Sequence, residues 1–267
     1  MNNNIAIIGC GWLGRPLAGH LIKKGFHIKG STTSEEKLSV LRAEGVDPYK
    51  ITLYENSIKG NIHGLLSDTD TAIINIPPKL RRNNAENYVS KIRTLVYELE
   101  KANIKNLLFV SSTTVYSNNN RIITEESPRT ANSKSGKQLK EIEDFLTNNN
   151  NLNTTILRFS GLIGNDRNPV TYLSGKKYIA NPNAPVNLVH LDDCILIIER
   201  IVSGQIWNES FNVASPSHPS KENYYTQEAN KRNITPPGFN HEKASEGKII
   251  SSDKLIRTLN YQFITEL

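Results

Sequence analysis

Three glycines near the start of the chain constrain its fold more than any other feature. They form the pattern Gly9-x-Gly11-x-x-Gly14, which directly follows the apolar run Ile5–Ile8 and opens a segment with helical spacing of leucines. In such a pattern the glycines allow a tight turn, a close approach of backbone to ligand, and close packing of helix on strand. Because the amino end of a helix attracts anions, the pattern predicts a dinucleotide with its pyrophosphate at this turn.

Apolar runs alternate with helical segments through the first two thirds of the chain. This alternation predicts a Rossmann-like α/β fold, a doubly wound parallel sheet with helices on both faces. The expected strands are Ile5–Ile8, Phe26–Gly30, Ala72–Ile76, Leu107–Ser111 and Thr155–Phe159. The expected helices follow the glycine pattern as far as Gly25, open at a capping box Thr33–Glu36, span Tyr88–Leu99, and contain Leu139, Ile142, Phe145 and Leu146.

After about residue 165 the composition of the sequence changes, and proline, asparagine and serine become frequent. Only Asp192–Val202 and Ser220–Lys231 look helical in this part, and Asp192 and Asp193 are expected as N-caps. We therefore expect a dinucleotide-binding domain over residues 1–165, with 186–214 returning to it. A small discontinuous substrate lobe would comprise 166–185 and 215–267, with a cleft over the carboxyl ends of the strands.

Composition excludes several other classes of function. The 32 basic residues are scattered among 26 acidic ones, without a basic stripe, so nucleic acid is not an expected partner. The beginning of the sequence lacks the features of a secretory signal, and no apolar run approaches the roughly 20 residues of a membrane helix. We therefore expect a cytoplasmic protein without a membrane partner. Cys10 and Cys194 have neither disulfide nor metal-ligand spacing, so no metal is expected.

The end of the second expected strand bears on the choice of cofactor. Sites for NAD place an acid about 20 residues after the glycines, where it binds the ribose hydroxyls. Here the strand ends in Ser31, Thr32 and Thr33, and the first carboxylate is Glu35, expected in the first turn of the next helix. With lysine and arginine close by in sequence, the pattern modestly favours NADP over NAD.

Four segments in this order resemble the extended short-chain dehydrogenase/reductase superfamily, specifically an atypical NAD-dependent epimerase/dehydratase-like branch of the nucleoside-diphosphate-sugar epimerases. They are the glycine pattern, LLFVSSTTVYS at Leu107–Ser117, SKSGKQLKE at Ser133–Glu141, and LRFSGLIG with VNLVHLDDC within Leu157–Cys194. The resemblance implies an NAD(P)-dependent oxidoreductase, epimerase or dehydratase. Its substrate would be a small molecule, with sugar nucleotides among the candidates. A homodimer formed through core helices is also implied.

The resemblance also implies roles for individual residues. Ser112 would orient the reacting oxygen of the substrate, with Ser111 beside it, and Lys137 would hold the nicotinamide ribose. The implied cofactor-binding residues are Gly9, Gly11, Trp12, Leu13, Gly14, Ser31, Thr32, Thr33, Asn75, Ile76, Pro77, Ser111 and Lys137. The implied catalytic residues are Ser112, Lys137, Tyr116 and Ser133.

One departure from the family pattern concerns the chemistry. Typical members carry Tyr-x-x-x-Lys on a helix, whereas this chain keeps Lys137 and has Ser133 at the tyrosine position. A phenol has a pKa near 10, which a nearby lysine can lower, but an aliphatic hydroxyl is a much weaker acid. Three explanations stay open: Tyr116 or a water transfers the proton, the reaction needs no protein acid, or the protein is a dinucleotide-binding sensor or regulator without catalysis.

The sequence supports two further predictions, one about His190 and one about an alternative family. His190, in the segment HLDD, is expected to make a structural hydrogen bond at the start of a helix. The opening IAIIGCGWLG also resembles 3-hydroxyacid and 6-phosphogluconate dehydrogenases, which continue into a long all-helical domain. The second half of this chain, rich in proline and asparagine, argues against that alternative.

Overall fold

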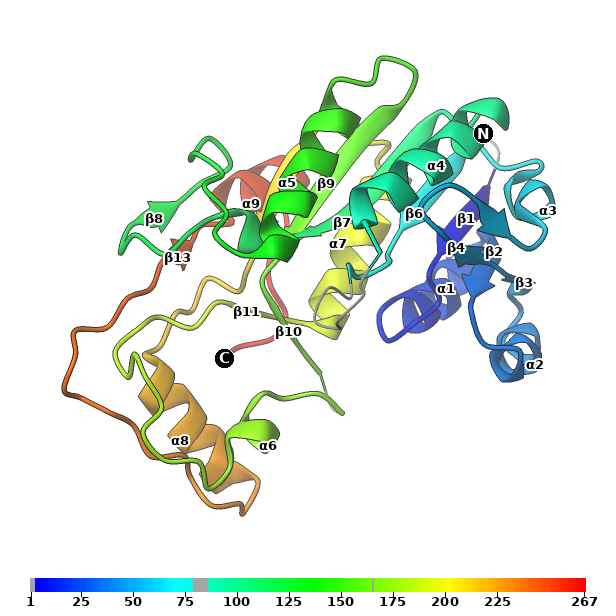
Figure 1. Ribbon diagram of the computed structural model, residues 1–267. Coiled ribbons are helices and arrows are strands. Elements are labelled where there is room, and N and C mark those ends of the chain that lie inside the picture. Colours follow the sequence, from blue (N-terminus) through cyan, green and yellow to red (C-terminus); the bar gives the residue numbers. More distant parts are fainter. Residues whose placement is uncertain (1–2, 79–85, 165) are drawn as a thin grey trace. The chain divides into compact units, whose positions relative to one another are not determined.

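The computed structural model describes residues 3–78, 86–164 and 166–267 (Figure 1). It divides into two compact units. The first unit comprises Met1–Val115, Ala131–Leu157 and Ile198–Ser210. The second comprises Tyr116–Thr130, Arg158–Ile197 and Phe211–Leu267. Each unit is therefore assembled from segments distant in sequence.

A seven-stranded sheet organises the fold, with the strand order β12-β9-β7-β6-β1-β2-β3. The strands are β1 Asn4–Ile8, β2 His27–Thr32, β3 Asp47–Lys50, β6 Thr71–Ile74, β7 Asn106–Ser112, β9 Asn153–Phe159 and β12 Ser210–Val213. β1 pairs in parallel with both β2 and β6, so the order reverses beside β1. This arrangement confirms the predicted doubly wound Rossmann-like fold, in which ligands bind at the reversal point.

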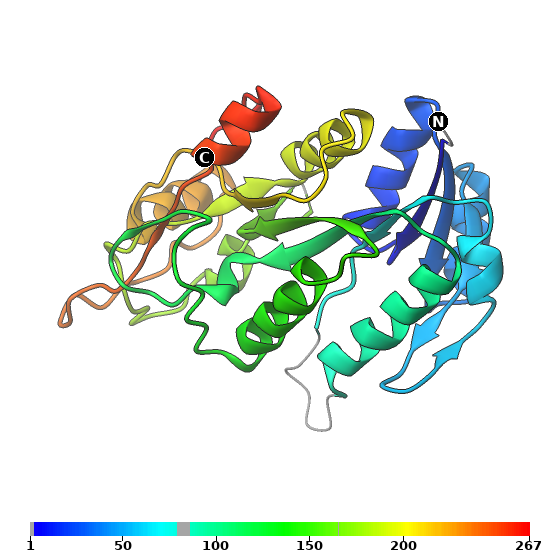
Figure 2. The same ribbon diagram turned by 90° about the horizontal axis from the view of Figure 1, so that it is seen from above.

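Helices cover both faces of the sheet, with α1 on one face and α4 and α5 on the other (Figure 2). The helices of this part are α1 Gly14–Lys23, α2 Glu36–Ala43, α3 Ile62–Leu66, α4 Tyr88–Lys101, α5 Lys134–Thr147 and the short 3-10 helix η1 Thr113–Val115. The apolar stripe of α4 is buried as its spacing predicts. Burial of such side chains is the main favourable term in folding.

The predicted capping box at Thr33–Glu36 is wrong. Helix α2 begins at Glu36, its N-cap position is Glu35, and none of the side chains that the structure describes caps it. The reason is local: the Thr32 hydroxyl accepts a hydrogen bond from the Ser34 N–H at 3.2 Å. This turn delays the start of the helix, so Glu36 alone of the two glutamates lies in the first turn.

The second unit contains strands as well as helices. β10 Gly161–Ile163 pairs in parallel with β11 Leu188–His190, and β8 Ile122–Ile123 pairs with β13 Ile249–Ile250. Its helices are α6 Val170–Leu173, α8 Lys221–Lys231 and α9 Asp253–Leu259. These strands exclude the long all-helical domain of the alternative reading. Within the described ranges, no helix is both long and apolar enough to cross a membrane.

Helix α7, Leu191–Ser203, corrects the expectation that Asp192 and Asp193 are N-caps, because both lie inside its first turn. Asp193 is buried and accepts hydrogen bonds from the Tyr261 hydroxyl at 2.7 Å and the Ile264 N–H at 2.9 Å. The first turn of α7 thus anchors the last segment of the chain. The His190 imidazole Nδ1 accepts from the Asp192 N–H at 3.2 Å, which is the predicted structural hydrogen bond.

Candidate functional site

The glycine loop connects β1 to α1 and has a geometry that larger residues would not permit. Gly9 has φ of +109°, and a Cβ atom there would lie 2.5 Å from the Asn75 carbonyl oxygen. A Cβ atom on Gly14 would lie 2.2 Å from the Gly9 carbonyl oxygen. Gly11 differs, since a Cβ atom there would meet no described atom within 4 Å. The turn therefore needs Gly9 and Gly14 for its own conformation, whereas Gly11 leaves open space beside the backbone.

The amino end of α1 offers unused hydrogen-bond donors. No side chain in the described part of the chain caps this helix. The Gly11 N–H bonds to the Gly9 carbonyl at 2.8 Å, but the N–H groups of Leu13 and Gly14 make no hydrogen bond with any residue that the structure describes. Helix N-termini need partners for these groups and carry a partial positive charge. The donor set and the space at Gly11 therefore fit a dinucleotide pyrophosphate.

Three neighbouring strand ends converge on this loop. The Ser31 hydroxyl, at the end of β2, accepts from the Gly9 N–H at 3.0 Å, and the Ser31 carbonyl accepts from Cys10 N–H at 2.8 Å. The side-chain amide of Asn75, after β6, donates to the Gly9 carbonyl at 3.3 Å. Ser31 and Thr32 are buried, while Thr33 is exposed. The structure therefore brings the predicted residues of β2 and β6 to the loop, where Ser31 and Asn75 also shape it.

The segment after β6 is held by a residue that sequence reasoning treated only as core. The Tyr88 hydroxyl, at the start of α4, donates to the Ile76 carbonyl at 2.5 Å. Burial raises the pKa of Tyr88, so its proton stays available for this bond. Pro77, the next predicted contact, is exposed. No sequence pattern signalled the Tyr88 bond, because it joins a helix residue to a backbone carbonyl 12 positions earlier in the chain.

The two serines at the end of β7 have different partners. The Ser111 hydroxyl donates to Glu143 Oε1 at 2.5 Å, and both residues are buried. The Ser112 hydroxyl accepts from the Thr114 N–H at 3.2 Å. The Ser111 proton is therefore committed to a carboxylate, which leaves Ser112 as the better placed donor to a substrate. Glu143 was not anticipated, although an acid on the apolar face of α5 is a visible anomaly in the sequence.

Helix α5 carries Ser133 and Lys137 in different roles. Ser133 is the N-cap, and its hydroxyl accepts from the Gly136 N–H at 3.0 Å. Lys137 lies in the first turn with an exposed side chain, whose amine has no hydrogen bond or ion pair among the described residues. A Cβ atom on Gly136 would lie 2.3 Å from the Thr114 carbonyl. Glycine therefore lets the Lys137 turn pack against the segment that follows Ser112.

Tyr116, the predicted alternative proton donor, belongs to the second unit and is buried. Its hydroxyl donates to Asn212 Oδ1 at 3.0 Å and accepts from Arg158 Nη1 at 2.7 Å. Arg158 is itself buried. The phenol thus has partners of its own as donor and as acceptor, an arrangement typical of a structural tyrosine.

The two cysteines are buried and form no disulfide. Desolvation raises the pKa of the Cys10 thiol to about 12 and also raises the pKa of Cys194. Both thiols therefore stay protonated near neutral pH and are poor nucleophiles. Among the described residues, no group of acidic, histidine or cysteine side chains is arranged to hold a metal ion.

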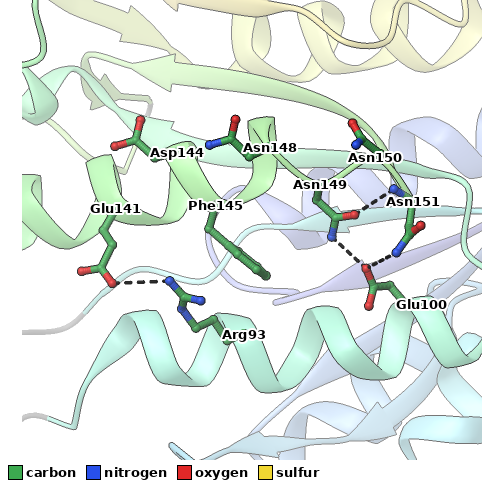
Figure 3. Close-up of a pocket in the computed structure, with 9 residues that line it drawn as sticks. All are labelled: Arg93, Glu100, Glu141, Asp144, Phe145, Asn148, Asn149, Asn150 and Asn151. Atoms are coloured by element: carbon green, nitrogen blue, oxygen red, sulfur yellow. Dashed lines mark hydrogen bonds and ion pairs between the residues drawn. The ribbon is translucent and has the colours of Figure 1, made fainter.

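A polar groove of about 690 Å³ is lined by residues of α4, of α5 and of the asparagine segment 148–151 that follows α5 (Figure 3). The guanidinium of Arg93 lies 4.6 Å from the centre of the Phe145 ring and 3.6 Å from Glu141. Glu100 accepts hydrogen bonds from the amides of Asn149 and Asn151. The groove contains none of the predicted site residues, and its polar groups largely satisfy one another. We therefore place the candidate site at the glycine loop and not here.

Comparison with known proteins identifies the family of the chain. A family model described as NAD(P)H-binding matches residues 9–183. Protein YeeZ of Escherichia coli K12 is 31% identical over 261 residues, covering 97% of this chain and 95% of YeeZ. The match extends well beyond the glycine loop in both comparisons.

Solved structures share the whole fold at low sequence identity. One is MoeE5 in complex with UDP-glucose and NAD, with a TM-score of 0.79, 15% identity, and coverage of 99% of this chain and 94% of that chain. Another is the UDP-glucose 4-epimerase of Thermotoga maritima with UDP-glucose, with a TM-score of 0.80, 14% identity, and coverage of 98% and 94%. A putative NAD-dependent epimerase/dehydratase from Methylobacillus flagellatus has a TM-score of 0.76, 23% identity, and coverage of 99% and 94%.

Proposed function

The chain belongs to the NAD(P)H-binding family, with the fold of NAD-dependent epimerases and dehydratases, and from this premise we propose that it catalyses hydride transfer on a small substrate. The observation that carries the proposal is the amino end of α1, where no side chain of the described residues caps the helix and the N–H groups of Leu13 and Gly14 bond to no described residue. When bound there, the nicotinamide dinucleotide supplies or accepts the hydride. Sugar nucleotides are the first substrates to test, because similar folds bind UDP-glucose.

The roles of the chain's own residues follow from their positions. Lys137 holds the nicotinamide ribose with its exposed ammonium group, and the Ser112 hydroxyl donates a hydrogen bond to the reacting oxygen of the substrate. A donor fixed in this way stabilises charge that develops on the oxygen. Gly136 supports both roles, because it lets the first turn of α5 pack against the segment after Ser112. The small second lobe, residues 166–185 and 215–267, is proposed to bind the rest of the substrate.

The first test measures cofactor binding directly. Purified protein is titrated with NADPH and with NADH, following nicotinamide fluorescence and the emission of Trp12 in the glycine loop. We expect both to bind and NADPH to bind more tightly. Absence of binding by either nucleotide near a millimolar would remove the basis of the proposed function.

The second test measures turnover. A panel of sugar nucleotides, aldehydes and ketones is screened with each cofactor, and the Ser112→Ala and Lys137→Ala variants are compared on any substrate found. We expect Ser112→Ala to lower kcat/KM about 100-fold, the size typical of losing one such donor. We expect Lys137→Ala to weaken cofactor binding as well. Unchanged turnover in both variants would show that the active site is elsewhere.

A second candidate function, a dinucleotide-binding sensor without catalysis, is favoured by two observations. The Ser133 hydroxyl caps α5, and the Tyr116 phenol is enclosed by Arg158 and Asn212. Neither hydroxyl is placed as a ready proton donor. Tight cofactor binding without hydride exchange across the whole panel would support this function over the first.

We also propose an oligomeric state and a cellular location. The family resemblance implies a homodimer, which light scattering of the purified protein would detect as twice the mass of 29.9 kDa. A cytoplasmic location is the second assignment, and cell fractionation tests it.

A further inference from the structure

The end of β2 has a charged neighbour that the sequence pattern does not reveal. β3 pairs with β2 in parallel, and the register places Lys50 beside Thr32. The two side chains therefore leave the same face of the sheet at its carboxyl end. Lys50 Nζ forms an ion pair with Glu35 Oε2 at 2.8 Å. Glu35 is the first carboxylate after β2, and it is the residue that could bind ribose hydroxyls.

The backbone of Lys50 is fixed on both sides. The next residue, Ile51, donates its N–H to the Thr32 carbonyl at 3.0 Å. Gly60, with φ of +115°, packs so closely that a Cβ atom there would lie 2.1 Å from the Lys50 carbonyl oxygen. The side chain, in contrast, is 49% exposed, and that of Glu35 is 70% exposed. The backbone of Lys50 is therefore held in place, while its ammonium group is exposed to solvent and can exchange partners.

Two nearby cations are already committed to protein partners. The amine of Lys29, on β2, donates to the carbonyls of Gly64 and Ser67. Arg15, just after the glycine loop, binds Glu44 through two nitrogens. Glu35 and Lys50 offer the two chemistries that discriminate the cofactors, since an acid binds a ribose 2′-hydroxyl and a cation binds a 2′-phosphate. In the ion pair, each of these groups neutralises the other.

We propose that Lys50 receives the 2′-phosphate of NADP and that Glu35 is its counter-ion, so that this ion pair sets the preference between NADP and NAD. The inference rests on the proposed dinucleotide site. A phosphate carries more negative charge than a carboxylate, so it competes effectively for Lys50. Displaced from Lys50, Glu35 turns to solvent.

The test uses the full-length protein and direct binding. Dissociation constants for NADPH and NADH are measured for the wild type, Lys50→Met, Glu35→Gln and the double variant. Lys140→Met is the matched control, because Lys140 forms a similarly exposed ion pair with Asp144 at 3.1 Å on α5. Adenosine 2′,5′-bisphosphate and 5′-AMP are used as fragment probes that differ only in the 2′-phosphate.

The two substitutions should move the cofactor preference in opposite directions. Lys50→Met should weaken NADPH and the bisphosphate at least tenfold while NADH and 5′-AMP change less than threefold, since a charge-assisted hydrogen bond of this kind is lost. Glu35→Gln should tighten NADPH several-fold and weaken NADH. Lys140→Met should leave both unchanged.

The outcomes also separate this inference from the proposed function. If Lys50→Met weakens NADPH and NADH equally, the ion pair only braces β3, and the inference is overturned. An unchanged NADPH affinity overturns it as well. If the wild type binds neither nucleotide, the proposed dinucleotide site itself fails. Higher salt should weaken NADPH more than NADH in the wild type but equally in Lys50→Met.

Discussion

At Gly11 an added side chain is expected to weaken cofactor binding without destabilising the fold. Gly9 and Gly14 are needed by the turn itself, whereas a Cβ atom on Gly11 would meet no described atom within 4 Å. We expect Gly11→Val to unfold at a temperature within a few degrees of the wild type and to lose at least tenfold in NADPH affinity, because the branched side chain would occupy the pyrophosphate space. Thermal unfolding and fluorescence titration measure the two effects.

Ser133 is accounted for by its hydrogen bond as a helix cap. Replacing such a cap by alanine costs about 1 kcal/mol. We expect Ser133→Ala to lower the free energy of unfolding by about that amount, and Ser133→Asp to restore it, because aspartate also caps and suits the positive helix end. Urea denaturation tests both. If Ser133→Ala abolishes turnover while stability is unchanged, the serine has a chemical role.

The contact of helix α5 with the turn after β7 depends on Gly136. Overpacking a tight contact typically costs about 1–3 kcal/mol. Gly136→Ala should lose stability in this range, and it should also reduce turnover because the Lys137 turn is displaced. Gly19→Ala in α1 is the control, since a Cβ atom there would meet no atom of the described residues within 4 Å, and alanine favours a helix over glycine by about 0.5–1 kcal/mol. A stable, fully active Gly136→Ala variant would refute the contact's importance.

The helices and strands were predictable where their own residues define them. The five expected strands were found because apolar runs between turns identify buried strands. β3 was missed because its sequence, DPYK, begins with turn formers and ends with a charge. It lies at the sheet edge, where proline is tolerated and partners on β2 supply the pairing. The capping box failed because the Thr32 hydroxyl bonds to Ser34 instead.

The residues of the candidate site, like the helices and strands, could be predicted from sequence only in part. The glycine loop could be found from sequence because its geometry restricts residue types at fixed spacing. Tyr88, Glu143 and Lys50 could not, because each acts on a residue distant in the chain: Ile76, Ser111 and the end of β2 respectively. The family pattern pointed to Ser112 with Ser111 beside it, and the structure adds that the Ser111 hydroxyl is bonded to the buried carboxylate of Glu143.

The molecule as a whole should lose stability in alkali. Burial raises the pKa of Tyr225 to about 12 and that of Tyr49 to about 12, above the ordinary value of 10.0. Between these values the folded state binds more protons than the unfolded state, so stability falls as pH rises from about 10 to 12. Lowered pKa values of Lys221 and Lys248, also caused by burial, act in the opposite direction.

Tyr225→Phe isolates this effect, because it removes one titrating group from the core of the second unit. Above pH 10 the slope of unfolding free energy against pH should become less negative by about 1 kcal/mol per pH unit. Tyr172→Phe, at a position 77% exposed, is the control and should leave the slope unchanged. Equal slopes for all three proteins would refute the role of Tyr225.

The contacts of Asp193 make the fold of the second unit depend on residues about 70 positions further along the chain. Its buried carboxylate accepts hydrogen bonds from the Tyr261 hydroxyl and the Ile264 N–H. A chain cut before Tyr261 would leave this carboxylate buried without these two partners, which is strongly disfavoured. Such a shortened chain should therefore be digested by proteases faster than the full chain.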